Sequence, residues 1–146
     1  MGCDIHGVLE RKVDGKWITS DTLSSHHAAN RQKDASVNGW SLPAPLDRNY
    51  DRFAALAGVR GDGPPARGLP DDLSETATLL ADHWEANGHS HSWLPLPEAV
   101  QIMADTEFWR ENEGPDRFVR KYPEDFFFGV DKKNLSEYRF VFWFDN

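Results

Sequence analysis

Residues 3–18 read CDIHGVLERKVDGKWI. In the first half, Cys3, Ile5, Gly7 and Leu9 alternate with a second set that is mostly polar, the period of two of a strand with one buried face. Asp-Gly at positions 14–15 then separates two such runs, which is a strong hairpin signal because both turn positions need positive φ. The stretch therefore predicts an N-terminal β-hairpin of roughly residues 3–13 and 16–20.

The run YRFVFWF at residues 138–144 predicts a second strand. Its alternating Tyr138, Phe140, Phe142 and Phe144 would give one fully apolar face, and the intervening residues are largely apolar as well. A strand that is apolar on both faces belongs inside a sheet and not at its edge.

Three helices are expected between these strands. Apolar spacing predicts one from Asp47 to Gly58, where glycine ends it. A second runs from a capping box, formed by Asp72 with Glu75, to Gly88. A third has Pro97 in its first turn and ends at Gly114-Pro115.

The remaining segments lack periodicity. Residues 21–46 read as a long polar loop, and residues 60–68 as a Gly/Pro loop in which no regular element survives. Because hairpin and helices come in blocks, the chain is predicted to be α+β: a single domain over 1–146, with an antiparallel or mixed sheet and about three helices packed on it.

Composition restricts the partners. A net charge of −8 and a pI near 5.1 argue against duplex nucleic acid and anionic membranes, both of which need clustered positive charge. The single cysteine cannot form an internal disulfide, and no apolar run approaches the ~20 residues of a membrane span. A cytoplasmic protein that folds around its many aromatic residues is expected.

Two short segments concentrate the polar chemistry, Asp4-Ile5-His6 and His89-Ser90-His91-Ser92-Trp93. Asp4 and His6 share a strand face, and His89 and His91 would point together if their segment is extended. Three interpretations stay open: a structural role in strand register and helix capping, contact with a small ligand, and ligation of a divalent metal.

For the metal, Asp4, His6, His89 and His91 are the candidates, since imidazole and carboxylate suit Zn, Mn or Fe. Asp4-Ile5-His6-Gly7 and Gly88-His89-Ser90-His91 resemble the first and last metal motifs of calcineurin-like metallophosphoesterases. The intervening motifs of that family are missing: Arg48-Asn49-Tyr50-Asp51 has tyrosine where a histidine ligand belongs.

Four arginines form a further candidate group: Arg48, Arg52, Arg60 and Arg67. Guanidinium groups bind phosphate or carboxylate in a bidentate manner, and the nearby glycines would let backbone N–H groups approach an anion. Aspartates are interleaved with these arginines, so ordinary surface ion pairing is the competing interpretation.

Several motifs resemble, over nearly the whole chain, an uncharacterised family of small tailed-phage and prophage proteins. They are Gly2-Cys3-Asp4-Ile5-His6, Arg48-Asn49-Tyr50 with Phe53-Ala54, Ala57-Gly58-Val59-Arg60, Arg67-Gly68-Leu69-Pro70, His89-Ser90 with Ser92-Trp93-Leu94, and Phe142-Trp143-Phe144-Asp145-Asn146. The resemblance implies a setting and not an activity. Small accessory proteins of phages act in the host bacterial cytosol, commonly on host processes or defence.

The sequence thus favours a phage accessory protein that binds a small polar or phosphorylated, nucleotide-like molecule, with a nucleotide signal of host defence as one candidate. The predicted ligand contacts are Asp4, His6, Asn49, Tyr50, Arg60, Arg67, His89, Ser92 and Trp93. The alternatives are a metal-dependent phosphohydrolase and an inhibitor that binds a host protein through its acidic surface.

Overall fold

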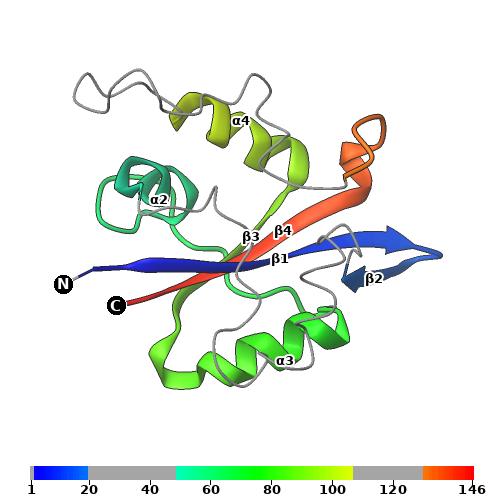
Figure 1. Cartoon of the computed structure of the whole chain (residues 1–146), viewed down its shortest axis with the longest axis horizontal. Coiled ribbons are helices and arrows are strands. Elements are labelled where there is room, and N and C mark those ends of the chain that lie inside the picture. The colour runs from blue at the N-terminus through cyan, green and yellow to red at the C-terminus, as the bar shows by residue number, and fades with distance from the viewer. Residues whose placement is uncertain (1, 20–48, 107–129) are drawn as a thin grey trace, which may run out of the picture.

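The computed structural model describes residues 2–19, 49–106 and 130–146. Four strands form one antiparallel sheet in the order β2-β1-β4-β3. Their bounds are β1 Asp4–Val13, β2 Lys16–Thr19, β3 His89–Pro95 and β4 Tyr138–Asp145. The helices are α2 Tyr50–Ala57, α3 Glu75–Trp84 and α4 Leu96–Thr106, with short 3-10 turns at Glu85–Asn87 and Leu135–Glu137. Figure 1 shows α2 and α4 on one side of the sheet and α3 on the other.

This arrangement confirms the predicted α+β class with its hairpin, inner C-terminal strand and three helices, and the sheet is antiparallel and not mixed. The loop expected over residues 21–46 lies outside the described residues, as do Arg48 and the predicted continuation of α4 toward Gly114. The Gly/Pro segment at 60–68 has no regular element, as expected.

The hairpin forms where the sequence predicts it. Asp14 and Gly15 have φ values of 50° and 79°, the left-handed conformation that a tight two-residue turn requires. The short β2 pairs only with the second half of β1, from Glu10↔Thr19 to Val13↔Lys16. The pairing of β1 with β4 is longer and runs from Asp4↔Asp145 to Arg11↔Tyr138.

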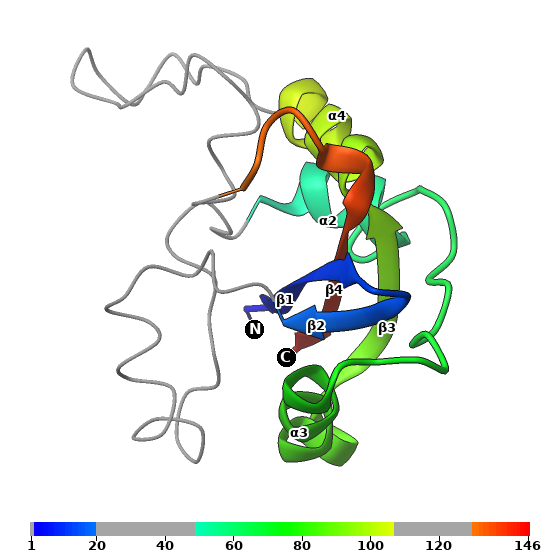
Figure 2. The same cartoon turned by 90° about the vertical axis from the view of Figure 1, so that its right-hand side faces the viewer.

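The central strand β4 separates two apolar cores. Phe140, Phe142 and Phe144 pack with residues of α2 and α4, whereas Val141 and Trp143 pack with α3. All residues from 138 to 144 are buried, because helices cover both faces of the sheet (Figure 2). This double coverage explains why the strand is apolar on both faces.

Two of the helix boundaries follow the predicted signals. Asn49 precedes α2 and its side chain accepts a hydrogen bond from the backbone N–H of Arg52, and Gly58 ends the helix at φ 67°. In α4, Pro97 occupies the first turn, where its missing N–H costs no helical hydrogen bond.

The predicted capping box of α3 is wrong. Ser74 precedes the helix, and its Oγ accepts from the backbone N–H of Ala77 at 3.2 Å. The carboxylate of Asp72 instead accepts a hydrogen bond from Arg139 Nη1 at 2.8 Å. Arg139 comes from β4, 67 positions further along the chain, so a tertiary ion pair removes Asp72 from the helix end.

Arg139 is also the centre of a buried polar network. Its Nε donates to Glu10 Oε1 at 2.5 Å, and Glu10 Oε2 accepts the backbone N–H of Ser74 at 2.6 Å. The guanidinium lies 4.1 Å from the ring centroid of Trp17. The network therefore joins β1, β2, β4 and the start of α3 by specific contacts.

None of the helices in the described part of the chain has the length and apolar composition required to span a bilayer.

Candidate functional site

Three strand ends meet at one end of the sheet. β1 begins where β4 ends, with Asp4 opposite Asp145 and His6 opposite Trp143. β3 also begins there, with His89 opposite Phe144. The two chain ends consequently lie side by side (Figure 1). The two polar segments singled out in the sequence are therefore brought to either side of the same strand end.

His6 lies between a ring and a carboxylate. It projects toward α3, where its ring stacks on Trp84 with centroids 4.0 Å apart and planes at 26°. Its Nε2 is 3.3 Å from Asp145 Oδ1, and the two side chains are 14% and 23% exposed. The pair is within ion-pair distance but lacks the alignment of a hydrogen bond.

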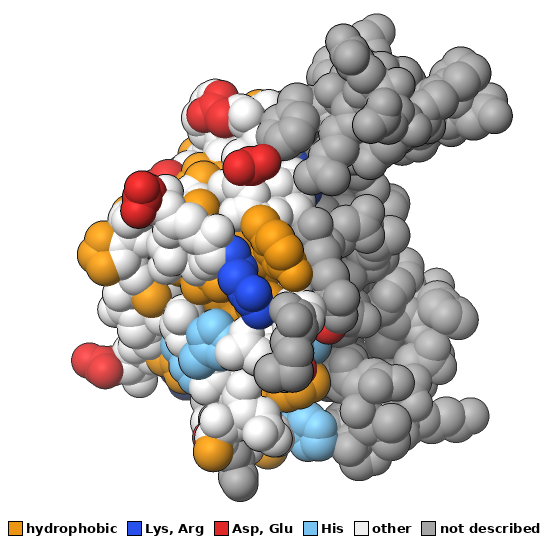
Figure 3. Space-filling model, turned by 90° about the vertical axis from the view of Figure 1, so that its left-hand side faces the viewer, with side chains coloured by type: hydrophobic (Ala, Val, Ile, Leu, Met, Phe, Trp, Pro, Cys, Tyr) orange, Lys and Arg blue, Asp and Glu red, His pale blue; other side chains and the backbone are white. Residues whose placement is uncertain are grey.

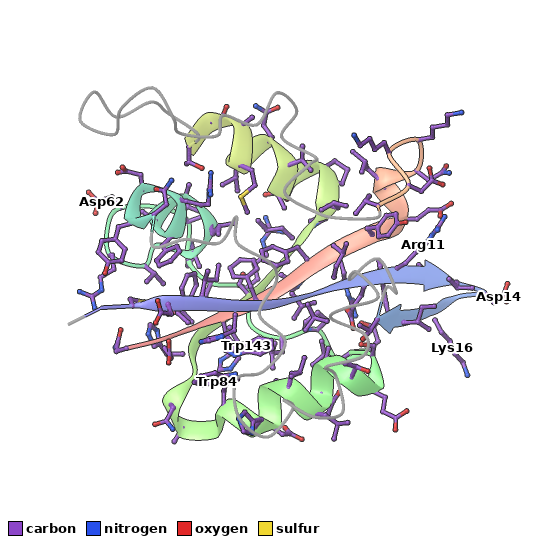
Figure 4. All side chains as sticks on the ribbon, in the orientation of Figure 1. Arg11, Asp14, Lys16, Asp62, Trp84 and Trp143 are labelled. Carbon is purple, nitrogen blue, oxygen red and sulfur yellow. The ribbon has the colours of Figure 1, made fainter. Side chains whose placement is uncertain are left out.

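A second imidazole and a second indole extend this group. His91 stacks on Trp143, with centroids 6.0 Å apart and planes at 26°. Trp84 and Trp143 both lie between the sheet and α3, as Figure 4 shows. We refer to His6, Trp84, His91, Trp143 and Asp145 as the indole cluster. Burial lowers the pKa of His91, and the neighbouring His89 lowers it further.

Gly88 allows these rings to approach the chain closely. A β-carbon placed there would lie 3.3 Å from each of three atoms: His91 Nε2, Trp143 Cδ1 and Trp84 Cβ. That spacing is tight but not prohibitive. Gly88, where the sequence predicts the end of the helix, comes directly after the 3-10 turn that follows α3. It also lies between the two indole rings.

Unpartnered buried polar atoms concentrate at this end of the sheet. Among the described residues, six buried side-chain atoms have no hydrogen-bond partner: His6 Nδ1 and Nε2, Trp84 Nε1, His89 Nε2, Trp143 Nε1 and Asp145 Oδ1. All but His89 Nε2 belong to the indole cluster, and His89 begins the adjacent strand. Buried polar groups are nearly always hydrogen-bonded, so this concentration makes the end of the sheet the candidate site.

A β-bulge decides how the histidines of β3 point. The register of β3 on β4 shifts between His89 and Ser92, and Ser90 has a φ of 54°. His89 consequently lies beside Phe144, whereas His91 lies beside Trp143. Phe144 and Trp143 are consecutive in a strand and face opposite sides. The expectation that His89 and His91 point together is therefore wrong.

The four candidate metal ligands, Asp4, His6, His89 and His91, do not come together in the structure. No group of three or more His, Cys, Asp or Glu side chains in the described residues is placed to hold a metal ion. Asp4 and His6 do share a face of β1, but the bulge at Ser90 turns His89 and His91 apart. Within the described residues, Asp4, His6, His89 and His91 do not form the shared ligand set that the phosphohydrolase alternative assigns to them.

A basic residue lies at the same end of the sheet, near the start of β1 but on the α2 side, across the sheet from the indole cluster. The guanidinium of Arg60 lies 5.5 Å from the ring centroid of Tyr50, whose hydroxyl accepts the backbone N–H of Cys3 at 3.4 Å. Burial raises the pKa of the Cys3 thiol, and Arg60 offsets part of that rise. Arg60 itself has a φ of 62°, unusual for a residue with a side chain. Figure 3 shows this end of the molecule, where histidine and basic side chains lie next to hydrophobic ones.

The other predicted contacts serve the fold. Asn49 caps α2 and donates from Nδ2 to the carbonyl of Thr106. The fully buried Ser92 accepts the backbone N–H of Arg67, and the guanidinium of Arg67 lies over Trp93 and pairs with Glu98. These contacts fix the loop after α2 against the edge of β3.

The described members of the arginine group are likewise separated. Arg52 is buried and donates from Nε to Thr106 Oγ1 at 2.9 Å, facing α4. Arg60 lies beside Tyr50, and Arg67 lies at the edge of β3. Of these three, Arg60 is the one at the same end of the sheet as the indole cluster, although on the α2 side.

Three members of the indole cluster were missed from the sequence: Trp84, Trp143 and Asp145. Each sits in a pattern that core packing explains by itself, at the apolar end of a helix or in an aromatic strand. A useful signal would have been the carboxylate of Asp145 directly after an apolar strand antiparallel to Asp4-Ile5-His6.

Comparisons with models of protein families, with curated proteins and with solved structures found no match.

Proposed function

We propose that this protein binds a small polar, phosphorylated molecule of nucleotide type at the indole cluster. The observation that carries the proposal is the concentration of unpartnered buried polar atoms at one end of the sheet. A ligand that meets these atoms would recover hydrogen bonds that the folded chain alone leaves unmade. An unmade buried hydrogen bond costs about 1–3 kcal/mol, so the gain per bond is substantial.

Arg60 supports the phosphorylated character of the ligand. It lies over the exposed ring of Tyr50, at the same end of the sheet as the cluster but on the α2 side, and its planar guanidinium is suited to an anionic oxygen pair. The chain as a whole carries a net charge of −8. A local cation in an acidic molecule favours a small anion and disfavours a long polyanion such as duplex nucleic acid.

Entry requires a movement at Trp84. The six unpartnered atoms are closed to solvent, but Trp84 itself is partly exposed and is the last residue of α3. The 3-10 turn Glu85–Asn87 and Gly88 follow it directly. The proposed binding therefore requires this helix end to move away from the sheet.

The resemblance to small phage proteins supports a biological setting for the proposal. A binding protein needs no complete catalytic set, and it acts by lowering the free concentration of its ligand. In the host bacterial cytosol, a phage protein of this kind would counteract defence by sequestering a nucleotide signal.

The proposal is tested by a thermal-shift screen over mono-, di- and cyclic nucleotides, followed by calorimetry. A bound ligand raises the melting temperature, because it stabilises the folded chain by an amount that grows with the logarithm of the ligand concentration relative to the dissociation constant. His6→Phe keeps the ring stacked on Trp84 but removes both ring nitrogens, so we expect it to weaken binding by about tenfold or more.

His83→Gln is the matched control, because His83 lies on the exposed side of α3 and has no unpartnered buried atom among the described residues. It should bind as the unmodified protein does. Absence of a thermal shift with every nucleotide, or equal binding by the His6→Phe variant, would contradict the proposal.

A further inference from the structure

The unpartnered atoms of the indole cluster have mixed hydrogen-bonding character. The indole Nε1 groups of Trp84 and Trp143 can only donate. The carboxylate oxygen Oδ1 of Asp145 can only accept when ionised. A histidine ring in its neutral form offers one donor and one acceptor. The cluster therefore holds both donors and acceptors, and Asp145 Oδ1 lies 3.3 Å from His6 Nε2.

A phosphate group suits this set poorly. Its oxygens would satisfy the two indoles, but they would also meet the carboxylate of Asp145, and like charges at short range repel strongly where water is excluded. An uncharged group that carries a donor next to an acceptor satisfies both kinds of atom. The hydrogen-bonding edge of a nucleobase has that pattern and adds a ring that can stack on indole.

Arg60 lies at the same end of the sheet as the indole cluster but on the opposite side of the sheet. Arg60 acts on Cys3, which packs in the core under α2, whereas His6 faces α3 on the other side of the sheet. Cys3 and His6 are three residues apart along extended chain, or about 10 Å. A ligand that reaches both places must extend around the end of the sheet, which inorganic phosphate cannot do.

We infer that the indole cluster takes the uncharged base of a nucleoside phosphate and that the phosphate lies outside it, at Arg60. The inference rests on the proposed function and specifies the orientation of the ligand in that site. Asp145 selects the base through the donor it requires, and Arg60 adds affinity through the charge of the phosphate.

The test is calorimetry with a matched series: a nucleoside monophosphate that binds, its nucleoside, and inorganic phosphate as competitor. We expect the nucleoside to bind more weakly than the nucleotide and inorganic phosphate at equal concentration not to compete. In Arg60→Gln the difference between nucleotide and nucleoside should largely disappear. In Asp145→Asn the preferred base should lose about tenfold in affinity, because an amide can replace the required acceptor with a donor.

Trp84→Phe supplies a second variant, since it keeps an aromatic ring but removes the indole N–H together with the five-membered ring that carries it. It should weaken nucleoside and nucleotide by the same factor, because it acts on the base alone. Melting curves without ligand establish that each variant is folded.

The outcomes separate the two proposals. If no nucleotide or nucleoside binds, the proposed function fails and this inference fails with it. If nucleotides bind but inorganic phosphate competes for the site, and Asp145→Asn leaves the order of base preference unchanged, the binding function stands and the orientation inferred here is overturned.

Discussion

Glu10 and Arg139 are charged residues buried in neighbouring strands of the sheet, and the fold depends on their pairing. Their side chains are 0% and 4% exposed. Removing one member of a buried ion pair leaves an uncompensated charge, which costs about 3–5 kcal/mol. We predict a loss of this size in the free energy of unfolding of Glu10→Ala, measured by urea denaturation.

Glu98→Gln is the control for this prediction. Glu98 pairs with Arg67 at a similar distance, 2.7 Å, but both side chains are about half exposed. An exposed ion pair contributes at most about 1 kcal/mol. Equal losses in the two variants would show that the buried pair contributes no more than a surface pair.

Gly7 provides a second prediction at the level of one residue. A β-carbon there would lie 2.5 Å from Phe140 Cε2 and 3.0 Å from the carbonyl oxygen of Val141. Gly7→Ala should therefore destabilise the protein by about 1–3 kcal/mol through overpacking. Phe140→Leu makes room beside β1, so the double variant should lose less than the sum of the single losses. Simple additivity of the two losses would contradict this account.

The start of α3 shows that a helix can be predicted correctly while the residue that caps its first turn is not. Asp72 and Glu75 have the right spacing for a capping box, but Arg139 binds Asp72 and the cap moves to Ser74. Ser74→Ala should cost about 1 kcal/mol of stability, the usual effect of losing an N-cap. Chemical denaturation measures this, with the exposed Ser136→Ala as control. An unchanged free energy of unfolding in Ser74→Ala would show that the serine hydroxyl does not stabilise the helix end.

Elements with strong local signals were predictable, and those with weak signals were not. Asp14-Gly15 fixed the hairpin, and the aromatic run of β4 fixed an inner strand, because turn chemistry and periodicity are local properties. No strand was predicted at His89–Pro95. The bulge at Ser90 breaks the period of two at the point where the pattern would have shown it.

The candidate site depends on the fold of the whole molecule. It exists because three strand ends and the end of α3 converge, and periodicity carries no information about such convergence. His6 was identified from the sequence, but its neighbours Trp84, Trp143 and Asp145 come from positions 78 to 139 residues away. The same distance in sequence hid the pairing of Glu10 with Arg139.

The pH range of stability is also a property of the whole molecule, and two groups with shifted pKa values, His91 and Cys3, affect it on either side of neutrality. The pKa of His91 is lowered from 6.5 by burial and by His89, so the unfolded chain binds that proton more readily. Stability should therefore fall as the pH drops below 6.5. The pKa of Cys3 is raised above 9.0 by burial, so the folded chain keeps that proton longer. Stability should likewise fall as the pH rises above 9.0.

We therefore predict a maximum of stability between these two values, seen by urea denaturation at a series of pH values. His91→Gln cannot take up the proton, so its stability should decline less steeply than that of the unmodified protein just below pH 6.5. His83→Gln, on the exposed face of α3, should keep the original decline. On the alkaline side, Cys3→Ala should remove the fall above pH 9.0. If the free energy of unfolding of His91→Gln falls as steeply below pH 6.5 as that of the unmodified protein, burial of His91 beside Trp143 is not the cause of the loss of stability in acid.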